Sequence, residues 1–486
     1  MRSINLPPYA PTLIESTRAI GYSLEAAVAD IIDNSIAALA SKVDVFFFPI
    51  DGEYIAFLDD GIGMNDEEIN AAMQYGSKNP LESRNEHDLG RFGLGLKTAS
   101  LSQCKALTVI SKQAKTICAR KWDVDYVAET GEWSLQVLET EEVESCPHFK
   151  ELMSLEFGTL VIWQKLDRLK AGEIKFEEAL GRKMDVVREH LSLVFHRYLT
   201  GEPGLNKFDI SINGQAVVPL DPFMTHKSVQ AMADEVLIVR GERILVRPYI
   251  LPHTSKMSAE EIKRMGGKEG LRRQQGFYIY RNKRLVVWGT WFRMMRQGEM
   301  SKLVRIQVDI PNMLDDLWTL DIKKSSAIPP AEVRMNLKNV IDKMAEKSKR
   351  TWTTRGKKET SADITHVWNR LKTRNGGYIY EINREYPLIQ ELINKNSECK
   401  SQLEMLIKQI ENNIPLNMLY LDLTNDEKVE NETEISKDEV FDMVRNVMHA
   451  TDAHLRQQML DSLRISEPFN YYDAEIREAY EKGTLI

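Results

Sequence analysis

The segment from Glu25 to Ala99 constrains the fold most, because three patterns follow one another within it. A helix with polar residues on one face comes first, a strand that ends in an acidic turn comes second, and a glycine-rich loop comes third. Each pattern alone occurs in many folds. In this order, and this close together, they are typical of a nucleotide site, in which a helix and glycine loops converge on phosphates.

The first pattern is an expected helix with one small, apolar face. The residues that recur on this face at helical spacing are Leu24, Ala27, Val28, Ile31 and Ser35. Asp30 and Asn34 are four positions apart, so they lie together on the other face. A carboxylate and a carboxamide in this arrangement suit a hydrated magnesium ion and the water that attacks a phosphate. A solvated polar face that includes Asp33 is the alternative.

The second pattern is a β-hairpin with its tight turn at Asp51-Gly52. Its second strand ends at Asp59, whose carboxylate could accept a hydrogen bond from the amino group of a base. Gly61 and Gly63 follow at once, and glycines allow the backbone to approach a flat ligand closely. An ordinary acidic turn is the alternative.

The third pattern is a glycine loop at the start of an expected helix. Gly90, Gly93 and Gly95 would leave backbone amides free to hold phosphates. The loop is not a dinucleotide-binding fingerprint, because no strand leads directly into it. Nor is it a Walker loop, since the spacing before Lys97-Thr98 is wrong.

Taken together, these patterns resemble the Bergerat-fold (GHKL) ATPases, which include gyrase B, the heat-shock chaperone, MutL and the MORC proteins. Three stretches most resemble the MORC-like ATPases encoded beside bacterial restriction and phage-defence genes: Gly21-Tyr22-Ser23, residues 75–80 and residues 90–100. The resemblance implies an α/β sandwich ATPase domain that binds ATP and Mg²⁺.

The resemblance also implies a role for each motif residue. Asp30 would be the general base, Asn34 would hold Mg²⁺, and Asp59 would bind the adenine amino group. The other residues expected at the nucleotide are Gly61, Gly63 and Met64 around the base, and Gly90, Gly93, Leu94, Gly95, Lys97 and Thr98 around the phosphates.

The chain departs from the family pattern at Asp30, where the best-known members usually carry Glu. Asp is one methylene shorter, so its carboxylate reaches less far. Because a misplaced catalytic group can lower a rate by orders of magnitude, we expect slow turnover but unimpaired ATP binding.

A fourth motif, Gly158-Thr159, opens a strand expected over residues 158–163. It resembles the last nucleotide motif of the family, in which the Thr hydroxyl supports the adenine-binding Asp. A threonine that merely suits a strand is the alternative.

Length and composition constrain the number of domains and the class of protein. The 486 residues are enough for roughly three domains, and 43% hydrophobic and 28% charged residues are ordinary for a soluble globular protein. A net charge of −8 argues against general affinity for nucleic acid, so DNA would need local basic patches. The four cysteines show no C-x-x-C spacing, which fits a reducing cytoplasm. No apolar run or signal-peptide pattern indicates a membrane.

We expect an ATPase domain over residues 1–200, including an N-terminal arm, and a strand-rich domain over residues 201–330. The second resembles the α+β transducer domain that follows the Bergerat fold in gyrase, MutL and MORC proteins. In those families a transducer lysine reaches the terminal phosphate. Lys324 is the first candidate for this catalytic role and Lys323 the second, unless both are simply solvated lysines.

Residues 331–486 are expected to form a helical C-terminal region, with helices near residues 332–349, 363–371, 386–396, 399–410 and 437–463. A basic run from Lys343 to Lys358 contains Trp352 and could follow a phosphate backbone. A solvated face or a linker is the alternative reading of that run.

The expected function is an ATP-driven homodimeric clamp or switch that acts on DNA or on DNA-processing partners in a bacterial defence or restriction system. A nuclease, helicase or methyltransferase would be such a partner. Two alternatives remain. One is a nucleotide-dependent assembly scaffold that hardly hydrolyses ATP, and the other is a chaperone-like ATPase.

Overall fold

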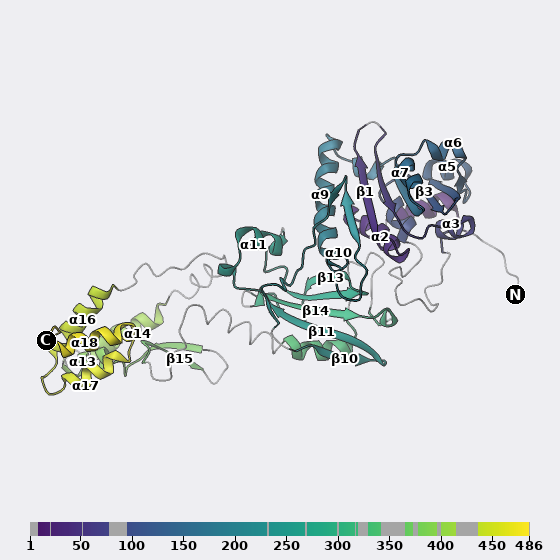
Figure 1. Ribbon diagram of the computed structural model, residues 1–486. Helices are drawn as coiled ribbons and strands as arrows, with labels where there is room; N and C mark the ends of the chain where they lie inside the picture. The colour runs from purple at the N-terminus through teal and green to yellow at the C-terminus, as the bar shows by residue number, and fades with distance from the viewer. Residues whose placement is uncertain are drawn as a thin grey trace. The chain divides into compact units, whose positions relative to one another are not determined.

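The computed structural model divides the chain into two compact units, Met1–Thr353 and Thr354–Ile486, which are described separately (Figure 1). It describes residues 8–19, 21–50, 52–76, 95–230, 233–267, 270–298, 301–315, 317–318, 329–341, 365–372, 378–395, 400–414 and 436–485.

The first unit begins with an eight-stranded sheet in the order β5-β4-β3-β6-β2-β1-β7-β8. Its strands are β1 (Lys42–Phe48), β2 (Tyr54–Asp59), β3 (Ala106–Gln113), β4 (Thr116–Asp123), β5 (Gln136–Val137), β6 (Phe157–Gln164), β7 (Asp209–Ile212) and β8 (Gln215–Ala216). Only β1 and β7 pair in parallel among these strands. The strands that carry Asp59 and Thr159, β2 and β6, are therefore central neighbours.

Helices cover both faces of this sheet. They are α1 (Ala10–Arg18), α2 (Leu24–Ala37), α3 (Asp66–Met73), α4 (Gly95–Leu101), α5 (Val124–Thr130), α6 (Thr140–Glu144), α7 (Phe149–Ser154), α8 (Asp167–Lys170), α9 (Phe176–Val194) and α10 (His196–Thr200). Along β2, Ile55 and Phe57 face the core shared with α2 and α9, whereas Ala56 and Leu58 face the core shared with α6 and α7. Burial on both faces explains the uninterrupted apolar run of β2.

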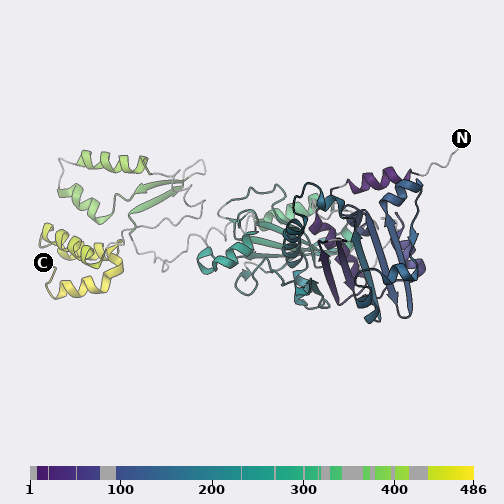
Figure 2. The same cartoon turned by 90° about the horizontal axis from the view of Figure 1, so that it is seen from above.

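The second sheet of this unit has the order β10-β11-β14-β12-β13, and β9 pairs with β11. Its strands are β9 (Val229–Gln230), β10 (Glu235–Val239), β11 (Glu242–Ile250), β12 (Gly276–Arg281), β13 (Arg284–Thr290) and β14 (Val304–Ile310). The helix α11 (Ala259–Gly266) and a helical stretch over residues 331–341 pack against it. Figure 2 shows its teal strands beside the purple and blue strands of the first sheet.

The first sheet continues beyond the domain boundary expected at residue 200. Its strand β7 pairs with β1 and forms a hairpin with β8. The reason is burial, because Ile210 and Ile212 belong to the core of the first sheet. The strand β4 ends at Asp123, whose side chain accepts a hydrogen bond from the backbone N–H of Asp125 at the start of α5.

The C-terminal unit is largely helical. It contains β15 (Trp368–Lys372), β16 (Tyr378–Ile382), α13 (Pro387–Lys395), α14 (Lys400–Asn412), α16 (Lys437–Ala450), α17 (Arg456–Arg464), the 3₁₀ turn η5 (Phe469–Tyr472) and α18 (Asp473–Glu481). The helix expected over residues 363–371 is wrong, because residues 368–371 belong to β15, which pairs with β16 in antiparallel orientation. The helix expected over residues 437–463 is interrupted between α16 and α17. In the part of the chain that the structure describes, no helix combines the length and apolar character needed to cross a bilayer.

Candidate functional site

The carboxylate of Asp59 lies at the end of β2 and is held by three hydrogen bonds. The hydroxyl of Ser35 on α2 donates to Oδ2 over 2.7 Å. The backbone N–H groups of Gly61 and Thr159 donate to Oδ1 over 3.0 and 3.2 Å. Asp59 is only 7% exposed, so these donors fix its orientation in the interior. A helix, a turn and a neighbouring strand therefore converge on one carboxylate.

Burial changes the chemistry of Asp59. It raises the pKa of this carboxyl from 3.8 to about 6, although the hydrogen bonds from Ser35, Gly61 and Thr159 act in the opposite direction. A carboxylate offers about four acceptor positions, of which the three donors use two on Oδ1 and one on Oδ2. Oδ2 thus keeps an acceptor position for the N–H of a ligand.

Glycines allow the backbone to pack tightly around this carboxylate. A Cβ atom on Gly61 would lie 2.9 Å from the Cβ of Ala38 and 3.1 Å from Oδ1 of Asp59. Gly63 has a φ of +68°, and a Cβ atom there would overlap the carbonyl oxygen of Lys112. Both positions therefore need glycine, which is the packing reason for the pattern after Asp59.

The sequence suggested that the hydroxyl of Thr159 supports Asp59. In the structure, the backbone N–H of Thr159 makes this contact. Ser111 and Thr159 stand directly opposite each other in the β3–β6 register, so their side chains share one face. Their hydroxyl oxygens lie 3.0 Å apart, and Ser111 Oγ also accepts the backbone N–H of Met64 over 2.8 Å. This small network positions Met64 beside the acidic turn.

The helix α2 carries Asp30, which is 5% exposed. The hydroxyl of Tyr22 donates to its Oδ2 over 3.1 Å. A Cβ atom on Gly95 would lie 4.0 Å from the same oxygen, so the carboxylate faces the first residue of α4. Asn34 lies one turn further along α2 and is exposed. One helix thus carries both polar residues expected to act together, and Asp30 lies beside Gly95, where the glycine loop ends.

The sequence left open that Asp33 belongs to a solvated polar face of α2. This alternative is wrong, because Asp33 is buried. Its side chain is 2% exposed, and Nε of Arg284 on β13 donates to its Oδ1 over 3.1 Å. The same guanidinium places Nη2 4.0 Å from Oδ1 of Asp30. Arg284 was missed by the sequence reasoning, because nothing near it in the chain marks it as a partner of α2.

The phosphate-loop candidates are only partly described. Lys97 is 2% exposed, and its Nζ donates to the carbonyl oxygen of Ala72 over 2.8 Å, which ties α4 to the end of α3. Thr98 is also buried in α4. The remaining candidates lie outside the described residues: Gly90, Gly93, Leu94, Lys323 and Lys324.

The protein oxygen atoms near Asn34 can bind Mg²⁺ only if a bound phosphate and water supply further oxygen ligands. Within the described residues, no group of three or more His, Cys, Asp or Glu side chains could hold a metal ion. Mg²⁺ typically keeps several waters and takes few protein oxygens when it accompanies phosphates. The exposed carboxamide of Asn34 suits that kind of site.

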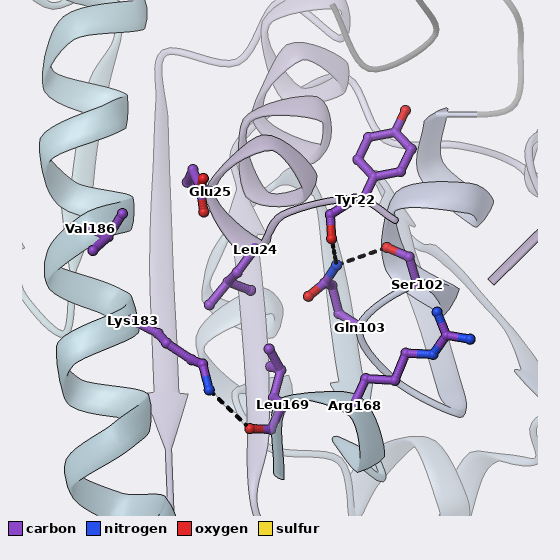
Figure 3. A pocket seen from close by; sticks show the side chains of 9 residues that line it. All are labelled: Tyr22, Leu24, Glu25, Ser102, Gln103, Arg168, Leu169, Lys183 and Val186. Atoms are coloured by element: carbon purple, nitrogen blue, oxygen red, sulfur yellow. Dashed lines mark hydrogen bonds between the residues drawn. The ribbon is translucent and has the colours of Figure 1, made fainter. Parts of the chain in front are cut away.

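A separate cavity of about 420 Å³ lies at the start of α2 (Figure 3). Tyr22 forms part of its wall, and the carbonyl oxygen of Tyr22 accepts a 3.1 Å hydrogen bond from Gln103 Nε2. The other end of Tyr22 reaches Asp30. Lys183 on α9 also lines the cavity and donates over 3.2 Å to the carbonyl oxygen of Leu169. Asp59 does not line this cavity, so it is distinct from the acidic turn.

Comparisons with known proteins address the fold of this region. Residues 22–159 match the family model described as histidine kinase-, DNA gyrase B-, and HSP90-like ATPase. A search of curated proteins finds no match. One similar solved structure, titled as the N-terminal domain of a DNA repair protein, is 17% identical and has a TM-score of 0.43; the match covers 70% of this chain and 98% of that chain.

The matched segment contains features that the structure brings together, which are α2, the turn after Asp59 and the Gly158-Thr159 pair. It also spans the glycine motif of residues 90–95, most of which lies outside the described residues. The fold class expected from the sequence is confirmed, with mixed α and β structure in the first unit and a largely helical C-terminal region. Residues 22–159 therefore have the fold of the GHKL, or Bergerat, ATPases.

Proposed function

We propose that this chain binds ATP with Mg²⁺ and hydrolyses it slowly, and that the nucleotide acts as a switch. The observation that carries the proposal is the buried carboxylate of Asp59, which keeps an acceptor position on Oδ2 within a GHKL-fold domain. An amino group such as that of adenine supplies the matching donor.

At the base end of the nucleotide, Asp59 accepts the adenine amino group. Gly61, Gly63 and Met64 shape the surface against which the ring lies. Thr159 contributes by donating its backbone N–H to Asp59, which keeps the carboxylate aimed. The tight packing at both glycines supports this assignment, because it leaves backbone rather than side chains at the turn.

At the phosphate end, Asp30 takes a proton from the attacking water, whose oxygen bonds to the terminal phosphorus as the bond to ADP breaks. Tyr22 holds the carboxylate in place through its hydroxyl. Asn34 would hold Mg²⁺, which would supply positive charge to neutralise the phosphates. The residues proposed to surround the phosphates are Gly90, Gly93, Leu94, Gly95, Lys97 and Thr98, with Lys324 or Lys323 at the terminal one.

The wider role that we propose is an ATP-driven homodimeric clamp acting on DNA or on DNA-processing proteins in a bacterial defence or restriction system. Support comes from the MORC-like motif sequences and from the basic run between Lys343 and Lys358, all of which lies outside the described residues. The second sheet and residues up to 330 would serve as the transducer.

One observation favours the scaffold alternative, in which ATP is bound but hardly hydrolysed. Asp30 is one methylene shorter than the Glu that the best-known GHKL ATPases usually carry, and it is only 5% exposed. A carboxylate that reaches less far activates water poorly, since a misplacement of about 1 Å can lower a rate about 100-fold.

Steady-state ATP turnover with and without plasmid DNA tests the proposal, with Asn34→Ala as the control for contaminating ATPases. Turnover that DNA stimulates and that Asn34→Ala abolishes supports the DNA clamp. Tight ATP binding that is lost in Asn34→Ala, without any turnover, favours the scaffold. The absence of nucleotide binding would contradict both.

A further inference from the structure

Arg284 connects the second sheet to the helix that carries the proposed general base. It is the first residue of β13 and follows a tight turn in which Asn282 and Lys283 have φ values of 48° and 66°. Two positive φ values in succession are typical of a hairpin turn that keeps the strand twist. The tip of the β12–β13 hairpin is therefore a rigid mount for Arg284.

The guanidinium of Arg284 lies beside two carboxylates on successive turns of α2. Nε donates to Oδ1 of Asp33 over 3.1 Å, and Nη2 lies 4.0 Å from Oδ1 of Asp30. The exposed fractions of Arg284, Asp33 and Asp30 are 5%, 2% and 5%. Water therefore screens these charges little. The guanidinium holds Asp33 by a hydrogen bond, and it attracts the carboxylate of Asp30 electrostatically across 4.0 Å, which is too far for a hydrogen bond.

The rest of the hairpin is fixed to the end of the first domain. The hydroxyl of Tyr198 on α10 donates to the carbonyl oxygen of Asn282 over 2.6 Å. Nε2 of His196 lies 2.7 Å from the hydroxyl oxygen of Tyr280 on β12. The guanidinium of Arg284 also lies over the ring of Phe195, 5.7 Å from its centroid. A movement of the hairpin relative to α10 would thus change the contact of Arg284 with α2.

We propose that Arg284 is a positioning residue that sets the orientation of Asp30 and reports the placement of the second sheet to the nucleotide site. This inference rests on the proposed ATPase function. When the hairpin is docked, Arg284 holds α2 through Asp33 and steadies Asp30. When the hairpin shifts, Asp30 loses that restraint and turnover stops, while the adenine site at Asp59 keeps its own hydrogen bonds.

The test compares Arg284→Met and Arg284→Lys in the full chain, with ATP affinity and kcat measured separately. We expect Arg284→Met to lower kcat about 30-fold or more while the Kd for ATP changes by less than about threefold. Arg284→Lys keeps a charge but cannot contact both carboxylates in the same way, so it should recover part of the lost rate.

Arg281→Met is the matched control. Arg281 lies opposite Arg284 in the same hairpin, is 3% exposed, and pairs with Asp315 through hydrogen bonds of 2.7 to 3.0 Å. Arg281→Met removes an arginine that is about as buried as Arg284, but its carboxylate partner, Asp315, comes after β14 in the chain and is not on α2. At a temperature at which all variants are folded, Arg281→Met should keep kcat within about threefold of the unmodified chain.

The double variant Asp33→Asn with Arg284→Met separates positioning from folding. It removes the buried negative charge that Arg284 no longer balances, so thermal stability should recover while kcat stays low. Recovery of kcat together with stability would overturn the inference, because Arg284 would then be purely structural. If the unmodified chain turns over ATP and Arg284→Met has the same kcat, this inference alone would be overturned. An unmodified chain without turnover would overturn it together with the proposed hydrolysis.

Discussion

The hydroxyl of Ser35 donates a 2.7 Å hydrogen bond to Oδ2 of Asp59 and so joins α2 directly to the end of β2. Ser35 follows Asn34 in the chain and lies five positions after Asp30. One helix therefore bears both the residues proposed for the phosphate end and the donor that orients the residue proposed for the base end. Nucleotide recognition and hydrolysis would share a single rigid element.

Ser35→Ala should weaken both stability and ATP binding. Removing the donor takes one stabilising hydrogen bond from a buried carboxylate, which we expect to raise the pKa of Asp59 further and to cost about 1.5 to 3 kcal/mol of unfolding free energy. Chemical denaturation and ATP titration would measure the two effects. Ser41→Ala is the control, because Ser41 makes a similar contact to Asp60 at an exposed position and should cost less than about 1 kcal/mol. Equal costs would contradict the account.

Asp59→Asn should stabilise the fold at neutral pH. Burial raises the pKa of Asp59 from 3.8 to about 6, so the folded chain holds the proton more tightly than the unfolded chain. The stabilising contribution is fully present below pH 3.8 and is lost as the pH rises through about 6. Urea denaturation should therefore find the variant more stable at pH 7.5, by up to about 3 kcal/mol, with the difference shrinking towards pH 4. A difference independent of pH would contradict this.

Gly63→Ala should be far more damaging than Gly52→Ala. Both glycines have positive φ values, +68° and +81°, so alanine is strained at either position by about 1 to 2 kcal/mol. At Gly63 the new Cβ would also overlap the carbonyl oxygen of Lys112, whereas nothing lies within 4 Å at Gly52. We expect a loss of at least about 3 kcal/mol for Gly63→Ala. Similar melting temperatures for the two variants would show that the turn is not closely packed.

Tyr22→Phe should lower kcat without weakening ATP binding. It keeps the ring and removes the hydroxyl that donates to Oδ2 of Asp30. We expect kcat to fall about 10-fold while the Kd for ATP stays within about threefold. Tyr54→Phe is a matched control, since its hydroxyl contacts His148 away from α2. A rate unchanged in Tyr22→Phe would mean that Asp30 does not depend on this hydrogen bond.

The acidic turn could be predicted from the sequence because its parts are adjacent in the chain. Asp59, Gly61 and Gly63 act through local backbone geometry, and the structure accounts for both glycines by packing. The helix α2 could also be predicted from the sequence, because its apolar periodicity and the capping residue Ser23 are local signals. Interactions between residues close in the sequence were therefore enough to predict this part of the site.

The contacts made by distant residues could not be predicted. Arg284 follows Asp33 by 251 positions, and an amphipathic pattern alone places Asp33 on a solvated face. The burial of Asp33 comes from the packing of another sheet, which periodicity does not report. The same limit explains β7, which joins the first sheet by pairing with β1 more than 160 positions earlier. In the C-terminal unit, Trp368 lies in β15 where a helix was expected, and tryptophan is enriched in strands.

The most direct test of the central claim is a calorimetric titration of ATP and GTP into the unmodified chain and into Asp59→Asn. Adenine offers an amino group to the acceptor position of Asp59, whereas guanine presents a carbonyl oxygen at the same ring position. We predict that the unmodified chain binds ATP at least about 100-fold more tightly than GTP, and that Asp59→Asn loses most of this preference. Equal binding of the two nucleotides, or no ATP binding at all, would contradict the assignment of Asp59 as the adenine-recognising residue.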